Sequence, residues 1–81
     1  MLRTPRYTKE YFASRGKEIY AQSILPKLDS SDANKYVAID IETGDFERDT
    51  SDFAASQRLL VRCPDAQIWL ERVGHSTARR F

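Results

Sequence analysis

Apolar and polar residues alternate along the chain with two periods, one helical and one extended. Apolar or small residues recur at helical spacing between Phe12 and Ile24, which predicts a helix over residues 8–25 with Thr8 as its N-terminal cap. Gly16 lies inside this helix, where glycine costs about 1 kcal/mol relative to alanine. Its small size would permit another element to approach the helix closely at that position.

The next ordered stretch follows a polar linker over residues 29–35 and has the period-two pattern of a strand. One face carries Val37, Ile39 and Ile41, and the other carries Ala38, Asp40 and Glu42. Because only one face is fully apolar, we expect a half-buried strand. Gly44 supplies a turn and residues 46–48 return as a second strand, so a β-hairpin is predicted over residues 36–48.

A second helix is predicted after the hairpin, because the capping residues 49–52 precede an apolar stripe. The stripe expected to face the core consists of Phe53, Ala54, Gln57, Leu60 and Val61. Arg58 and Arg62 are expected to point away from the core. Residues 66–73 then alternate again and predict a third strand, with Trp69 on its less apolar face.

The predicted fold class is α+β, in the order helix, strand, strand, helix, strand, with helices packed on a small three-stranded sheet. Residues 1–81 are expected to form one domain, with a flexible arm over 1–7, a ββαβ unit over 36–73 and a tail over 74–81. A core of this size supplies only a few kcal/mol of net stability and leaves a sheet face and strand edges open. We therefore predict a homodimer or a larger assembly. The expected interface anchors are Phe12, Tyr20 and Trp69.

The formal net charge of +1 conceals three segments of opposite sign. Residues 1–35 hold seven basic and four acidic residues, residues 36–56 one basic and six acidic, and residues 57–81 five basic and two acidic. The acidic middle segment can pair with the chain's own basic ends or with a basic partner protein. The carboxylates predicted to contact a protein partner are Asp40, Glu42, Asp45 and Glu47.

Basic residues interleaved with aromatic residues at the two ends of the chain give the alternative prediction, which is contact with a nucleic acid. The candidate contacts are Arg3, Arg6, Lys9, Arg15, Lys17, Arg79 and Arg80, and the aromatic residues are Tyr7, Tyr11 and Phe12. A sequence pI near 7.9 and the lack of two helices in direct succession argue against this alternative.

Catalytic chemistry has one candidate pair, Asp40 and Glu42, which share a strand face. The surrounding segment 39–44 resembles the first metal-binding motif of the DnaQ-like exonucleases, but that family carries further acidic motifs over a longer domain. We reject an exonuclease and keep a metal-dependent enzyme only as a third hypothesis. The single histidine, His75, and the single cysteine, Cys63, form no metal or nucleophile set. We therefore expect no enzyme, no cofactor and no metal site.

Four stretches of the chain carry a family resemblance. They are KYVAIDIETGD over 35–45, the pair Leu59-Leu60, PDAQIWL over 64–70 and the residues 72–75 that follow. Together they resemble a family of small uncharacterised bacterial proteins, frequent in cyanobacteria, with the same layout over roughly residues 8–81. The family resemblance implies no activity. The element order is also loosely similar to antitoxin domains of the HicB type, which implies a role in binding and restraining a partner protein.

These patterns together predict a non-catalytic protein-interaction module, and the specific form considered for it is the antitoxin-like component of a two-gene pair. No apolar run approaches the ~18 residues of a membrane span, and no signal peptide is recognised, so the cytoplasm is the expected compartment and no membrane contact is expected. A regulator that binds nucleic acid through the basic N-terminal helix and the C-terminal tail is the alternative.

Overall fold

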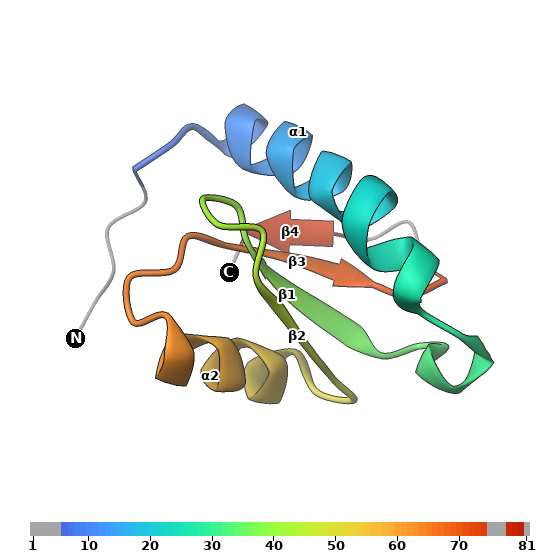
Figure 1. The fold of residues 1–81 in the computed structure, drawn as a ribbon. Coiled ribbons are helices and arrows are strands. Elements are labelled where there is room, and N and C mark those ends of the chain that lie inside the picture. The colour runs from blue at the N-terminus through green and yellow to red at the C-terminus, as the bar shows by residue number, and fades with distance from the viewer. Residues whose placement is uncertain (1–5, 75–77, 81) are drawn as a thin grey trace.

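The structure is a computed structural model that describes residues 6–74 and 78–80, and it contains two α-helices and an antiparallel sheet (Figure 1). The strands are β1 (Tyr36–Asp40), β2 (Phe46–Asp49), β3 (Ile68–Arg72) and β4 (Ala78–Arg80), in the order β2-β1-β3-β4 across the sheet. The α-helices are α1 (Lys9–Ile19) and α2 (Asp52–Arg62). Helix α1 continues through a π-helical turn, Tyr20–Ile24, and a 3-10 turn, Leu25–Lys27, and a separate 3-10 turn covers Ser30–Asp32.

The predicted α+β fold class is confirmed, with the predicted order of elements and with helices packed on an antiparallel sheet. The sheet has one strand more than predicted, because residues 78–80 of the expected tail pair with β3. Three residues are too few to show an alternation, so the sequence pattern did not indicate this strand. Its addition makes β2 and β4 the two edge strands of the sheet.

Helix α1 begins as predicted, because the Thr8 hydroxyl accepts a hydrogen bond from the Tyr11 N–H. The helical run extends past the predicted end to residue 27, because Pro26 lies at the start of the 3-10 turn, where no N–H is required. Gly16 faces β3, and a Cβ atom there would overlap the indole ring of Trp69. The expected close approach at Gly16 is therefore confirmed.

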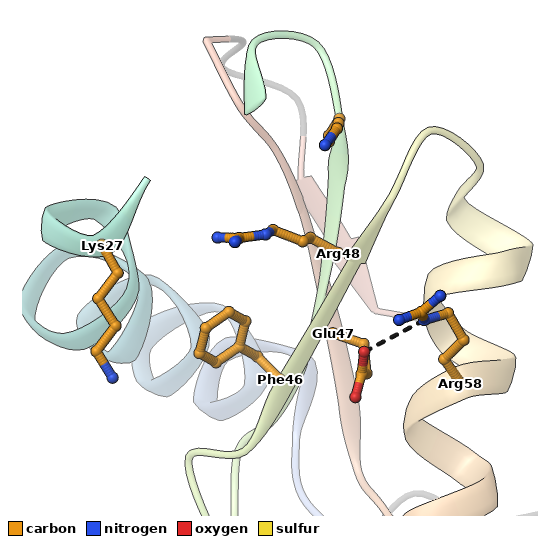
Figure 2. Close-up of a pocket in the computed structure, with 6 residues that line it drawn as sticks. Lys27, Phe46, Glu47, Arg48 and Arg58 are labelled. Atoms are coloured by element: carbon orange, nitrogen blue, oxygen red, sulfur yellow. Dashed lines mark hydrogen bonds and ion pairs between the residues drawn. The ribbon is translucent and has the colours of Figure 1, made fainter. Parts of the chain in front are cut away.

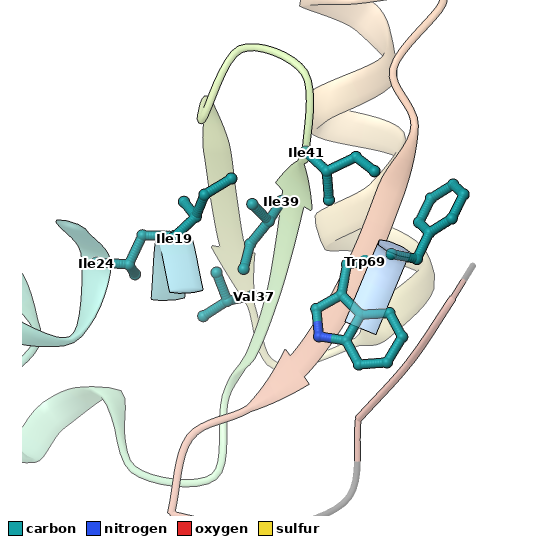
Figure 3. Close-up of a cluster of buried hydrophobic side chains, with 7 residues drawn as sticks. Ile19, Ile24, Val37, Ile39, Ile41 and Trp69 are labelled. Atoms are coloured by element: carbon teal, nitrogen blue, oxygen red, sulfur yellow. The ribbon is translucent and has the colours of Figure 1, made fainter. Parts of the chain in front are cut away.

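The two helices cover opposite faces of the sheet, with α1 on one side and α2 on the other (Figure 1). On the α1 face, the buried cluster contains Phe12, Ile19, Ile24, Val37, Ile39, Ile41 and Trp69 (Figure 3). On the α2 face, it contains Ala38, Ala55, Leu59, Ala66, Ile68 and Leu70. The prediction of a half-buried sheet is therefore wrong at Ala38 and Asp40, which are both buried. Within the described residues both faces of the sheet are covered, so an uncovered face no longer argues for a dimer.

Helix α2 is rotated relative to the sequence prediction. Phe53 and Val61, which were expected to face the core, are 61% and 81% exposed, whereas Ala55, Ser56 and Leu59 are buried. The small side chains of Ala55 and Ser56 allow the helix to lie close to β1 and β2. The same rotation brings the two arginines of α2 to the carboxylates of β2, rather than away from the fold.

Candidate interaction surface at the edge of β2

The predicted acidic partner surface is used within the chain, beginning with Asp40. This residue is 3% exposed. Its carboxylate accepts hydrogen bonds from the Glu42 N–H at 3.0 Å and the Thr43 hydroxyl at 3.1 Å. It also accepts a longer one, at 3.4 Å, from the main-chain N–H of Gln67. These bonds fix the turn between β1 and β2 and tie it to the segment before β3. The prediction that Asp40 contacts a partner is therefore wrong, because its oxygens are buried and occupied.

Glu42 is bound by the segment that precedes α1. The Arg6 guanidinium donates to its carboxylate, and so does the Tyr7 hydroxyl at 2.8 Å. The Arg6 N–H also donates to the Gln67 side chain at 2.8 Å. The hydrogen bond from Arg6, followed by that from Tyr7, holds the pKa of Glu42 below its usual value. Arg6 and Tyr7, which the sequence assigned to a flexible arm, are therefore bound to the fold, and residues 1–5 of that arm lie outside the described residues.

The remaining hairpin carboxylates pair with α2. Arg62 lies 2.7 Å from an oxygen of Asp45 and 2.7 Å from one of Glu47, while Arg58 lies 3.3 Å from Glu47 and 3.9 Å from Asp49. The hydrogen bond from Arg62 lowers the pKa of Asp45. Of the two interpretations that the charge pattern left open, pairing within the chain is the one observed for Glu42, Asp45 and Glu47.

The predicted dimer anchors lie in the monomer core. Phe12 and Trp69 are buried in the cluster between α1 and the sheet, so the prediction that they anchor a surface contact is wrong. The indole N–H of Trp69 donates to the Glu71 carboxylate at 2.7 Å. Tyr20 is half-buried against the same cluster, where burial raises the pKa of its hydroxyl. Aromatic size alone does not separate a core anchor from an interface anchor.

The structure brings part of the predicted nucleic-acid contacts together, because helix α1, with Lys9, Arg15 and Lys17, lies beside β4, which carries Arg79 and Arg80. Arg6 is paired at the hairpin turn, and Arg15 lies 2.7 Å from Glu18 on α1. Lys9 and Lys17 are exposed on the same helix. Arg3 lies outside the described residues. Arg79 and Arg80 belong to β4, and the structure does not describe their side chains.

A hollow of about 450 Å³ lies instead along β2, at the edge of the sheet (Figure 2). Its lining residues are Lys27, Lys35, Phe46, Glu47, Arg48 and Arg58. They come from the turn after α1, the residue before β1, strand β2 itself and helix α2. Four of the six are cations and one is an acid, so the hollow is suited to an anionic ligand.

The positive charge of the hollow is only partly balanced on the α1 side of β2. The side chains of Lys35 and Arg48 each place a nitrogen 3.4 Å from the same oxygen of Asp32, whose carboxylate is buried. Asp32 therefore serves two cations with neither contact short, and the Asp29 carboxylate lies within electrostatic reach of both cations. The Lys27 ammonium lies 5.9 Å from the ring centroid of Phe46, within cation–π range. This side of the strand consequently has an excess of positive charge.

Sequence reasoning missed the lining cations because they are scattered between residues 27 and 58 and form no motif. They meet only because the hairpin places β2 at the sheet edge, between the end of the α1 helical run and α2. One signal was available in the sequence. Arg48 is the single basic residue in the acidic segment 36–56.

No three His, Cys, Asp or Glu residues come together as a metal site within residues 6–74 and 78–80. Over the same part of the chain, no helix is long and apolar enough to cross a membrane. Comparison with protein families, with curated proteins and with solved structures gave no match to this chain. The resemblances to a bacterial family and to HicB-type domains therefore stay predictions.

Proposed function

We propose that this protein is a non-catalytic module that binds an acidic segment of a partner protein in the hollow along β2. The observation that carries this proposal is the set of four cations around one edge strand, two of which share a single buried carboxylate. An anionic side chain entering the hollow would complete the pairing of Lys35 and Arg48. The partner is thus acidic, opposite in sign to the one expected from the acidic hairpin.

The distribution of charge favours a short acidic segment over a long nucleic acid. Asp45, Glu47 and Asp49 lie on or next to the same strand, so a phosphate backbone that continued past the hollow would meet carboxylates. A peptide can place its carboxylates at the cations alone. An antitoxin-like role remains one form of this function, and it requires a partner protein with an acidic, extended segment.

The direct test is a fluorescence-anisotropy titration with a labelled peptide of about eight residues in which Glu alternates with Thr. Arg48→Glu should weaken binding about tenfold, because it replaces an attraction of about 0.2–1 kcal/mol by a repulsion of similar size. Lys17→Glu is the matched control, since it changes net charge equally on the exposed face of α1. Thermal melts of both variants verify folding. Equal weakening by the two variants, or no binding at low salt, would refute the proposal.

A nucleic acid is the second candidate, favoured by the contact between Lys27 and the Phe46 ring at the hollow. Cations beside an aromatic ring can hold phosphates and stack on a base. A labelled single-stranded oligonucleotide in the same titration separates the two functions. We expect it to bind more weakly than the acidic peptide at equal salt concentration, and the reverse order would favour the nucleic-acid function.

A further inference from the structure

We infer that the acidic segment binds as an additional β-strand paired with β2, rather than as a disordered chain held by side chains alone. This inference rests on the proposed function and specifies how the backbone of the partner is recognised. An extended peptide added to a sheet edge gains main-chain hydrogen bonds, while its alternating side chains reach both faces of the sheet. Strand β2 offers outward-facing main-chain groups for such hydrogen bonds and cations for the side chains of the added strand.

The register of the hairpin shows which backbone groups of β2 point outward. The Asp40 N–H donates to the Asp45 carbonyl, and Ile39 lies opposite Phe46. Hydrogen-bonded and non-hydrogen-bonded pairs alternate along an antiparallel ladder. Phe46 and Arg48 are therefore in the non-hydrogen-bonded positions, and their N–H and C=O groups face away from β1.

The chain's own side chains occupy the first of these two positions. The Phe46 N–H donates to the Asp45 carboxylate at 3.2 Å, and the Phe46 carbonyl accepts from Arg62 at 3.1 Å. These contacts protect that end of the edge, as natural sheets commonly do. Within the residues that the structure describes, nothing comparable covers the N–H and C=O of Arg48. Pairing with a partner strand would therefore begin at Arg48.

The cations that are only partly balanced lie on the α1 side of this open edge. The side chains of Phe46 and Arg48 point toward Lys27 on one side, while Glu47 and Arg58 meet on the other (Figure 2). Because successive side chains of a strand point to opposite faces, every second side chain of an added strand would face Lys27 and Arg48, and alternating carboxylates fit that side. A second copy of β2 would bring the same cations against each other, so the occupant that fits is an acidic segment of another protein.

The test compares the Glu-Thr peptide with a version methylated on its backbone nitrogens, which keeps every carboxylate but cannot donate main-chain hydrogen bonds. We expect the methylated peptide to bind at least tenfold more weakly. Hydrogen exchange of the Arg48 amide, followed by NMR, should slow at least tenfold when the unmethylated peptide is bound. The exchange of the Glu10 amide, in the exposed first turn of α1, should not change.

The possible outcomes separate the two proposals. If both peptides bind equally and the Arg48 amide exchanges at its original rate, the added strand is wrong while the acidic binding function stands. If neither peptide binds in low salt, the proposed function fails and the added strand fails with it. Weaker binding of the methylated peptide together with slowed exchange at Arg48 supports both.

Discussion

The contact between Gly16 and Trp69 gives a prediction about the α1–sheet interface. In Gly16→Ala, the new methyl group would lie within 2.8 Å of the Trp69 Cβ and would overlap the indole ring. Rotation of the ring about its side-chain bonds cannot move the Cβ atom away. The ring is also buried, and its N–H is bonded to Glu71. Either the helix or β3 must therefore shift.

Two opposing terms set the size of this effect. Replacing glycine by alanine inside a helix stabilises the helix by about 1 kcal/mol. Inserting a methyl group into a filled core costs about 1–3 kcal/mol, and the backbone shift required here places the cost at the upper end of that range. We therefore expect Gly16→Ala to reduce the free energy of unfolding by about 2 kcal/mol. In a domain of this size, the melting temperature should fall by roughly 8–16 °C.

Urea unfolding followed by circular dichroism measures this change, and Ser14→Ala is its control. Ser14 lies on the exposed side of the same helix, so alanine there raises helix propensity without meeting a neighbour. The double variant Gly16→Ala, Trp69→Leu should lose less stability than the sum of its single variants, because the smaller side chain makes room for the methyl group. A Gly16→Ala protein as stable as Ser14→Ala would refute the close packing of α1 on β3.

Three further outcomes follow from individual side chains. The hydrogen bond from Arg6 lowers the pKa of Glu42 below its ordinary 4.5, so the ion pair stabilises the fold above that pH, and this stabilisation is lost as the pH falls through the lower folded value. In urea titrations, Glu42→Gln should therefore be less stable than the wild type at pH 7 and equally stable near pH 2. Among residues 6–74 and 78–80, the buried Ser56 hydroxyl has no hydrogen-bond partner, so Ser56→Ala should raise the unfolding free energy by about 1 kcal/mol. A lower unfolding free energy of this variant in calorimetry would contradict the assignment. Asp32→Asn removes the negative charge that Lys35 and Arg48 share, so it should strengthen acidic-peptide binding several-fold in anisotropy titrations. Weaker binding would contradict the recognition of acidic peptides by these two cations.

Much of the fold was predictable from local pattern. The helical spacing from Phe12 onward, the alternation in residues 36–42 and the turn at Gly44 each depend on neighbours in sequence, and each element formed where expected. Gly16 was the clearest single indication of tertiary packing, because a helix interior tolerates glycine at a cost that close contact can offset.

Features set by tertiary contacts were not predictable in the same way. Alternation assigned Asp40 to a wet face, but α2 covers that face and the carboxylate is used by the turn. The rotation of α2 depends on the small Ala55 and on the reach of Arg62 to the hairpin, so an apolar count around the helix placed Phe53 on the wrong side. The helix–sheet packing that determines these positions is not a periodic property of the sequence.

The candidate site was the least predictable part. The sequence pattern directed attention to the acidic hairpin and to the basic ends, whereas the structure pairs the hairpin carboxylates with Arg6, Arg58 and Arg62. The cations that remain partly unbalanced are Lys27, Lys35 and Arg48, which only the order of strands brings together.

The most direct test of acidic recognition at β2 is an NMR titration of the isotope-labelled protein with the Glu-Thr peptide. We predict that the largest amide shifts fall at Lys27, Lys35, residues 46–48 and Arg58, and that in Arg48→Glu they require about tenfold more peptide. Largest shifts in α1 around Lys9 and Lys17, or shifts spread evenly over the chain and unchanged in Arg48→Glu, would contradict binding at this edge.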